Sequence, residues 1–240
     1  MSNKSKSPKK TPLIILRLEA VLQSFGTTGR WYIRETDMEP SKSAIIGMIG
    51  NAMGLKKFDQ KLEDLDHALE MATRTDFQGD TLCDYHTIGK GSRSADGKFN
   101  PFTILTDRYY LQDSSFLVVI KSKDNDKKLL EEIANALQNP KRPIYIGRKC
   151  CIPTKPVFQE ITERYTSMEE AITNEPWESS YIPKYKLPAA LPKVLSATIE
   201  DPEGEYLKQD AFRSNPAESR AFRNVRQIHV PNPSLTRKKS

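Results

Sequence analysis

The apolar positions along the chain predict strands that alternate with helices. Residues 13–18 form a short run rich in Leu and Ile, which predicts a buried strand. A helical pattern begins only after Pro40, with apolar side chains over a wide face and Gly54 in position to end the helix. The polar loop that joins these two elements interleaves cations with aromatic residues.

Further along the chain, the pattern predicts a short helix over residues 61–69 and strands over 71–77 and 116–121. Residues 126–137 have apolar side chains at helical spacing, and residues 144–146 can form a fourth strand. The order strand, helix, strand, strand, helix, strand is the split βαβ arrangement. We therefore predict an α+β fold with a ferredoxin-like, RNA-recognition-type βαββαβ body.

Residues 80–113 separate two of these strands and are too long for an ordinary hairpin loop. Their flanks are rich in β-branched and aromatic residues, whereas residues 89–97 are rich in Gly and Ser and contain Lys90 and Arg93. This pattern predicts an inserted β-hairpin with a basic tip, which we call the thumb. It could be only a decorated loop, but loops of this length are usually functional or disordered, so we expect it to clamp a strand of nucleic acid.

The predicted domain organisation follows from the same patterns. Residues 13–157 hold the ferredoxin-like domain, with the thumb at about 80–113. Residues 158–236 form an irregular C-terminal appendage of uncertain structure, because prolines crowd the chain there. Basic tails cover residues 1–12, which we expect to be disordered, and residues 237–240.

Three arginines in the appendage, Arg220, Arg223 and Arg226, are spaced three apart. This spacing fits one face of a helix, although a strand is also possible. They could form a basic edge, but an ordinary solvated face is the more common outcome of such a charge run.

Charge along the chain limits how the protein can bind nucleic acid. The formal net charge is +6, but seven of the 37 Lys and Arg residues lie in the two tails. The remaining 30 face 31 acidic residues, so the body is about neutral. Any nucleic-acid binding must therefore come from local patches of positive charge rather than from the electrostatic field of the whole protein.

Composition also narrows the class of protein. No apolar run approaches the ~20 residues of a membrane span, and no signal-peptide core follows the first lysines. Cys83, Cys150 and Cys151 form no CxxC pair, and with three histidines they show no metal-ligand spacing. We expect no metal or cofactor and a reducing, cytoplasmic location.

Two loops and one helix start have the chemistry of a phosphate site. The loop with Gln23, Ser24, Phe25, Gly26 and Arg30 combines small, hydrogen-bonding and stacking groups, which suit phosphates and unstacked bases. At the helix start, Ser41 or Ser43 can cap free amides and Lys42 adds positive charge, so an anion would be favoured there. A well-capped core helix is the simpler interpretation. The second loop, a glycine turn with adjacent cations, consists of Gly147, Arg148, Lys149 and Cys150, and by itself could be only a solvated turn.

Taken together, these segments resemble the CasD family, the guide-RNA 5′-handle subunit of the type I-E CRISPR Cascade complex, in the RAMP superfamily. The resemblance rests on LEAVLQSFG from Leu18, EPSKSAIIGMIGNAMG from Glu39, CDYHT from Cys83, RYYLQDSSFLVVI from Arg108 and YIGRKCCIPTKPV from Tyr145. It covers roughly residues 13–157. The last third of the chain matches poorly, except for the Arg-rich segment near Arg220.

The resemblance implies a guide-RNA-binding assembly subunit that caps the 5′ handle of the crRNA, with the thumb lying over the RNA. It also implies docking to the Cascade large subunit and to the backbone subunits, and contact with target double-stranded DNA through the complex, without a membrane. Phe25 stands where the family has Trp, so a stacking face is kept but the indole N–H is lost. The predicted RNA-binding residues are Gln23, Ser24, Phe25, Gly26, Arg30, Ser41, Lys42, Ser43, Tyr85, His86, Lys90, Arg93, Arg108, Gly147, Arg148, Lys149 and Cys150.

An enzyme must also be considered, because related subunits of other CRISPR types are metal-independent ribonucleases that cut precursor guide RNA. Such cleavage needs a base near a 2′-hydroxyl and a cation or acid near the leaving oxygen. Tyr85, His86 and Lys90 could serve, but a histidine on a strand is more often a packing or hydrogen-bonding residue. We therefore expect binding without catalysis. A free-standing RNA chaperone is disfavoured, since the strands lack aromatic ribonucleoprotein signatures.

Overall fold

The computed structural model describes residues 10–27, 32–93, 96–177, 192–215 and 220–236. Its central strand is β1 (Leu13–Glu19), which lies where the sequence predicts a buried strand. Alternate side chains of β1 enter two hydrophobic cores: Ile14 and Leu16 pack in one, and Leu13 and Ile15 in the other. Both faces of the sheet are therefore covered, which is why this strand has a continuous apolar run.

The main sheet has seven strands in the order β10-β11-β9-β4-β7-β1-β8. β1 pairs antiparallel with β7 and β8, and β4 pairs antiparallel with β7 and β9. The quartet β4-β7-β1-β8, with α1 (Lys42–Met53) after β1 and α3 (Lys127–Gln138) after β7, is the predicted ferredoxin-like βαββαβ body. The bounds are β4 (Leu69–Phe77), β7 (Ser115–Ser122), β8 (Phe158–Thr162), β9 (Val194–Glu200), β10 (Tyr206–Ala211) and β11 (Ala221–Pro231).

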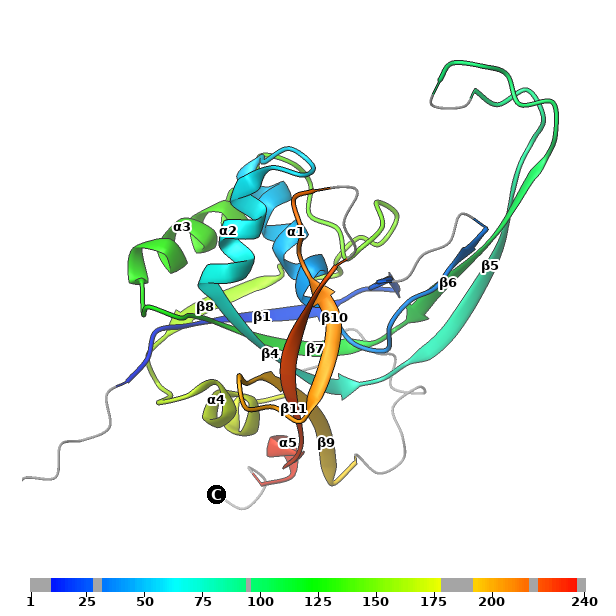
Figure 1. Ribbon diagram of the computed structural model, residues 1–240. Coiled ribbons are helices and arrows are strands. Elements are labelled where there is room, and N and C mark those ends of the chain that lie inside the picture. The colour runs from blue at the N-terminus through cyan, green and yellow to red at the C-terminus, as the bar shows by residue number, and fades with distance from the viewer. Residues whose placement is uncertain (1–9, 28–31, 94–95, 178–191, 216–219, 237–240) are drawn as a thin grey trace, which may run out of the picture.

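Helices cover both faces of this sheet (Figure 1). Three lie on the side of the larger core and carry its apolar side chains, whereas α4 packs with the smaller core on the other side. The helix predicted after Pro40 is α1, and the sequence also predicted α2 and α3. The bounds are α1 (Lys42–Met53), α2 (Gln60–Ala68), α3 (Lys127–Gln138), α4 (Met168–Asn174) and a short α5 (Pro233–Thr236). Within the described ranges, no helix combines the length and the apolar character needed to cross a membrane.

The predicted fourth strand at residues 144–146 is wrong. The Ile146 N–H donates to the Cys151 carbonyl at 2.8 Å, and the Cys151 N–H donates to the Arg148 carbonyl at 2.8 Å. These bonds close a local turn and use backbone groups that a strand would need for its ladder. The fourth strand of the body is instead β8, which pairs with β1.

The C-terminal segment differs from the predicted irregular appendage. β8 completes the ferredoxin-like sheet, and β9, β10 and β11 extend the same sheet beyond β4, so no structural boundary falls at residue 157. Two of the five prolines behind the prediction, Pro183 and Pro188, lie in residues 178–191, outside the described residues. Arg223 and Arg226 lie on β11, which confirms the strand alternative for the Arg-rich segment.

The thumb is a β-hairpin, as predicted. β5 (Asp80–Ile88) and β6 (Ile104–Gln112) pair antiparallel along their full length, and an isolated bridge joins Arg93 to Phe99 near the tip. The hairpin projects away from the body (Figure 1). At its base, β2 (Leu22–Gln23) and β3 (Ile33–Arg34) pair with β6, so the predicted RNA-binding loop and the thumb share one small sheet.

Candidate nucleic-acid interface

A cavity of about 830 Å³ lies beside α1, and we call it the α1 cavity. Its floor includes small residues of α1 such as Ala44, Gly47 and Gly50. The loop after β2, the α1–α2 connection, the turn around Gly147 and the segment after β10 form its walls. These four wall segments are far apart in the sequence, so the cavity is a product of the tertiary structure.

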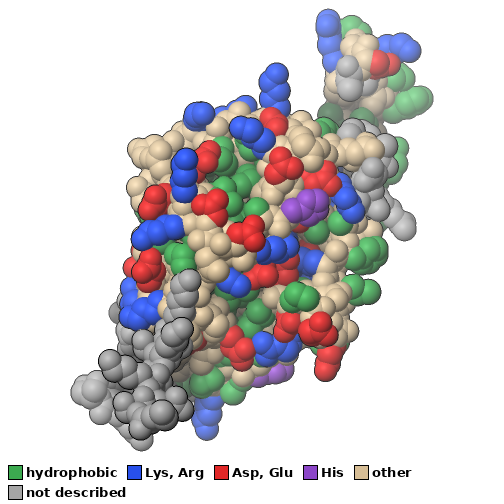
Figure 2. Space-filling view, turned by 60° about the vertical axis from the view of Figure 1, so that its left-hand side comes forward, with side chains coloured by type: hydrophobic (Ala, Val, Ile, Leu, Met, Phe, Trp, Pro, Cys, Tyr) green, Lys and Arg blue, Asp and Glu red, His purple; other side chains and the backbone are tan. Residues whose placement is uncertain are grey.

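The lining of the α1 cavity is strongly cationic. Glu35 is the one acidic residue among the described lining residues. The seven cationic residues are Arg34, Lys56, Lys57, Arg142, Arg148, Arg213 and Arg220. On the face of the body that Figure 2 shows, Lys and Arg are mixed with Asp and Glu. The positive charge is thus local, as the near-neutral body requires.

Main-chain carbonyl groups hold three of these arginines in place. Arg148 donates from Nη1 to the Tyr109 carbonyl at 3.0 Å and from Nη2 to the Arg34 carbonyl at 2.8 Å. Its guanidinium also lies 4.4 Å from the centroid of the Tyr110 ring. A carbonyl group positions a guanidinium without neutralising it, so the charge remains for an anion.

The other two arginines are held in the same way by carbonyl groups of other lining segments. Arg142 donates from Nη1 to the Leu55 carbonyl at 2.6 Å and from Nη2 to the Gly54 carbonyl at 3.0 Å. Arg220 donates from Nη2 to the Gly26 carbonyl at 3.1 Å. Burial lowers the pKa of Arg220 from its ordinary value, but an arginine still carries its charge at neutral pH.

Two buried polar atoms of the cavity lining lack a hydrogen-bond partner among the described residues. They are Oγ of Ser43, on the first turn of α1, and Nη1 of Arg220. Buried polar atoms in proteins are nearly always hydrogen-bonded, so each unpaired atom calls for an explanation. A hydroxyl group and a guanidinium N–H are both donors, and their residues line a cationic cavity, which favours an anionic ligand there.

Six of the predicted RNA-binding residues line this cavity: Ser24, Phe25, Gly26, Ser43, Gly147 and Arg148. Gly26 allows a close approach, because a Cβ built there would lie 2.5 Å from the Glu35 carbonyl oxygen. Phe25 behaves differently from the prediction. Its ring is 1% exposed and packs edge to face on Phe116 with centroids 5.7 Å apart, so its faces serve the core rather than a base.

The start of α1 corrects two further predictions. Ser41 is the N-cap residue, but its side chain makes no capping hydrogen bond. The anion at this helix terminus is internal, because the Lys42 N–H donates to Oδ2 of Asp210 at 2.9 Å. Lys42 Nζ is buried and bonds Glu200 Oε1 at 2.9 Å and the Leu69 carbonyl at 2.8 Å, so it does not leave a free charge.

This ionic cluster explains how the C-terminal segment reaches the cavity. Arg223 Nε donates to Oδ1 of Asp210 at 2.6 Å, which joins β11 and β10 to the start of α1. Burial by itself would raise the pKa of Asp210, but the hydrogen bonds and charge of Arg223 and the Lys42 N–H outweigh it and lower the pKa. Arg226 pairs with Asp201 and Glu169. Arg223 and Arg226 therefore stabilise the fold, and of the three arginines Arg220 lines the cavity.

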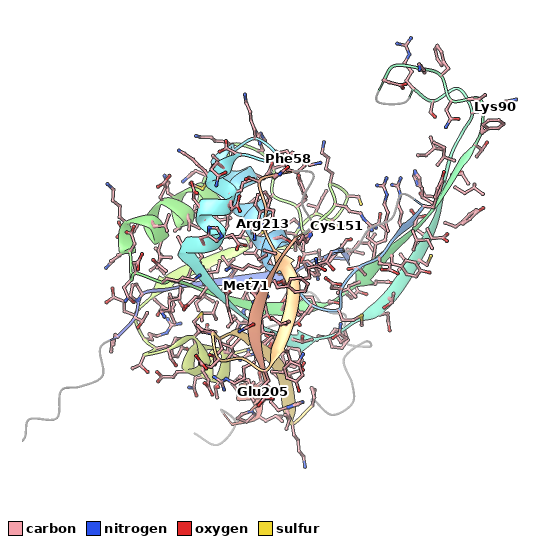
Figure 3. The ribbon with its side chains drawn as sticks, in the orientation of Figure 1. Phe58, Met71, Lys90, Cys151, Glu205 and Arg213 are labelled. Atoms are coloured by element: carbon pink, nitrogen blue, oxygen red, sulfur yellow. The ribbon has the colours of Figure 1, made fainter. Side chains whose placement is uncertain are left out.

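The other predicted residues that the structure describes do not line the cavity. Gln23 is buried and donates from Nε2 to the Ser114 carbonyl at 2.5 Å, and Arg30 lies outside the described residues. Figure 3 shows Lys90 at the far end of the thumb, distant from Phe58 and Arg213. The thumb also carries Tyr85, His86, Arg93 and Arg108, and the turn after Gly147 leaves Lys149 and Cys150 exposed.

Several cavity residues were missed by the sequence interpretation. Lys56, Lys57 and Phe58 follow α1 directly, and the cation–aromatic criterion applied to the loop before α1 would have found them. Arg142 and Arg213 carry no local signal, and Arg220 was noted only as one member of the Arg-rich segment. They enter the site only because the fold brings distant segments together.

Known proteins share the sequence and the architecture of this chain. Residues 13–231 match the family model of the CRISPR-associated protein (Cas_Cas5) family. The CRISPR system Cascade subunit CasD of Escherichia coli (strain K12) is 27% identical over 172 residues, with 68% of this chain and 77% of that protein covered. A chain from a CRISPR RNA-guided surveillance complex superposes with a TM-score of 0.71 at 25% identity, covering 93% of this chain and 92% of its own. The crystal structure of a Cas protein gives 0.64 at 27%, covering 92% and 96%. The match to the family model spans nearly all of the described chain, and the protein belongs to the CRISPR-associated Cas5 family.

Proposed function

We propose that this chain is the guide-RNA-binding subunit of a Cascade-type CRISPR complex, and that the α1 cavity holds the 5′ handle of the crRNA. The cationic lining with two unpaired buried donors, Ser43 Oγ and Arg220 Nη1, carries this proposal. Phosphate oxygens accept hydrogen bonds from such donors, and a single strand of RNA presents them at every nucleotide. The similarity to a Cascade subunit supplies the biological setting.

In this proposal the thumb and the body both contact the guide RNA, and other subunits of the complex dock around them. Tyr85 on β5 is 63% exposed and Phe102 near the tip is 73% exposed, which leaves aromatic faces available along the hairpin. We propose that the thumb closes over the guide, and that the complex docks the large and backbone subunits around this chain for targeting of double-stranded DNA. The free thiols Cys83, Cys150 and Cys151 are compatible with the proposed cytoplasmic location.

Binding without cleavage is part of the proposal. His86 Nδ1 lies 3.7 Å from Oδ2 of Asp84, so a histidine–carboxylate pair exists on β5. Tyr85 precedes His86 on the same strand and points to the opposite face, and Lys90 lies beyond the end of the strand. A base and an acid that face different sides cannot act on one phosphate, which favours a binding role over a ribonuclease.

Gly47 provides a steric test of the cavity. Gly47 lines the cavity, and a Cβ at this position would meet no atom within 4 Å. Gly47→Ala should therefore fold normally, with better helix propensity, while the longer side chain of Gly47→Leu should occupy the space of the ligand. We expect the full-length chain to bind single-stranded RNA of the repeat-derived handle more tightly than a scrambled RNA in a fluorescence anisotropy assay.

The two variants should then differ in their affinity for the handle RNA. Gly47→Leu should weaken handle binding by at least tenfold, and Gly47→Ala should match the wild type. If the leucine variant and the wild type bind the handle RNA with equal affinity, the RNA does not bind in this cavity. Site-specific cutting of precursor RNA in EDTA, abolished by His86→Ala, would replace the binding role with the ribonuclease alternative.

A further inference from the structure

The connection between α1 and α2 contains a backbone conformation that its sequence does not favour. The Asp59 N–H donates to the Lys56 carbonyl at 3.2 Å, which closes a turn of four residues. Phe58, the third residue of this turn, has φ 64°. Gly or Asn is preferred where a turn needs positive φ at this position, and a bulky aromatic residue there is an outlier.

Packing in the core does not account for this conformation. The Phe58 side chain is 41% exposed and lines the α1 cavity, so its ring gains little from burial. Lys57 Nζ lies 4.7 Å from the centroid of the ring. The turn thus presents an aromatic face and a cation together at the cavity edge, and strained backbone of this kind is concentrated at ligand sites.

The surroundings of Phe58 define the class of ligand. Arg142 is fixed nearby by the carbonyl groups of Gly54 and Leu55, the residues directly before the turn. Figure 3 shows Phe58 and Arg213 on the same side of the body, and both line the cavity. An aromatic face with cations around it suits a planar base attached to a phosphate.

We propose that Phe58 and Lys57 form a subsite for one unstacked nucleotide of the guide RNA, with the base on the Phe58 ring and a phosphate beside Lys57. This subsite rests on the proposed function and adds to it a single-nucleotide contact outside the loops predicted from the sequence. Because every base has an aromatic face, the subsite holds a position along the RNA rather than a particular base.

The variant Phe58→Asn tests the role of the aromatic ring in RNA binding without disturbing the turn. Asparagine tolerates positive φ, so this variant should be at least as stable as the wild type in thermal unfolding. It should bind the handle RNA about 5-fold to 140-fold more weakly, the range that corresponds to loss of one stacked base. Phe58→Trp should bind at least as well as the wild type, because it keeps an aromatic face.

An abasic scan identifies the stacked nucleotide. Single-stranded handle RNAs, each with one abasic position and a 3′-fluorescein label, are titrated with the full-length wild type and with Phe58→Asn. We expect one position at which loss of the base weakens binding to the wild type but has no further effect on the variant. Unchanged affinity of Phe58→Asn, or equal sensitivity of both proteins at every position, would overturn the subsite.

These outcomes differ from a failure of the proposed function. If Phe58→Asn binds as the wild type does while Gly47→Leu is impaired, the cavity still holds RNA and only the subsite is wrong. If the wild type does not prefer the handle RNA, both proposals fail. Lys57→Gln should lower the salt slope of binding by about 0.7, whereas Lys128→Gln on the exposed surface of α3 should not change it.

Discussion

Gly147 lies so close to Ser24 that a Cβ on Gly147 would be 1.7 Å from the Ser24 carbonyl oxygen. The Ser24 N–H donates to the Ile146 carbonyl at 3.2 Å, which fixes the two segments side by side. Gly147 also has φ 93°, a conformation that glycine adopts readily. The two loops that the sequence singled out separately are therefore parts of one wall of the α1 cavity.

Gly147→Ala should destabilise the protein and open this wall. The backbone conformation alone costs about 1–3 kcal/mol for a residue with a side chain, and the overlap with Ser24 adds to it. We expect a fall in the melting temperature of several degrees and weaker RNA binding. Gly89→Ala is the matched control, since a Cβ there meets nothing within 4 Å. A Gly147→Ala variant as stable as this control would contradict the close approach.

A buried ion network should matter more to stability than an exposed ion pair. Asp76 binds Arg74 at 2.5 Å and Arg17 at 2.5 Å, and all three side chains are almost fully buried. Asp76→Ala leaves two buried cations without their carboxylate, which should cost about 3–5 kcal/mol of unfolding free energy in urea denaturation. Glu163→Ala removes the exposed pair with Lys127 and should cost less than about 1 kcal/mol. Similar losses for both variants would contradict the assigned burial.

The hydrogen bonds between Glu63 on α2 and the segment after β10 should contribute less to stability in acid. Hydrogen bonds from Ser214 and from Arg213 lower the pKa of Glu63 to about 2, from 4.5. A lowered pKa in the folded state means that this contribution to stability is complete above about pH 4.5 and is lost as the pH falls toward 2. Glu63→Gln should therefore be less stable than the wild type at pH 7, and the difference should vanish near pH 2. A difference that is constant with pH would contradict the assigned pairing.

Removal of residues 1–9, which lie outside the described residues, should lower the nonspecific electrostatic attraction to RNA but keep the preference for the handle RNA. This segment contains three lysines, and Thr11, which bonds the Tyr165 carbonyl at 3.3 Å, is kept. Each lost phosphate contact lowers the salt slope by about 0.7, so the slope should fall by up to about 2 while preference for the handle RNA is unchanged. Loss of that preference in competition assays would show that the tail takes part in specific recognition.

Local patterns were sufficient for most of the body. The apolar run of β1, the wide apolar face of α1 and the helical spacing of α3 each record which side faces a core, so the ferredoxin-like order could be predicted. The fourth strand was misplaced, because residues 144–146 are entirely apolar whereas residues 158–162 include Gln159, Glu160 and Thr162. Only the pairing with β1 identifies the second segment as the strand.

The sequence by itself determined the βαββαβ order, the thumb and the loop chemistry around Ser24 and Gly147, because each depends on neighbours along the chain. Only the tertiary structure decided which charges are available. Lys42 and Arg148 both follow small residues in the sequence, yet Lys42 is buried against carboxylates whereas Arg148 is held by carbonyl groups that leave its charge intact. A cation's role depends on its partners, and one partner of each lies more than a hundred residues away: Glu200 for Lys42 and the Arg34 carbonyl group for Arg148.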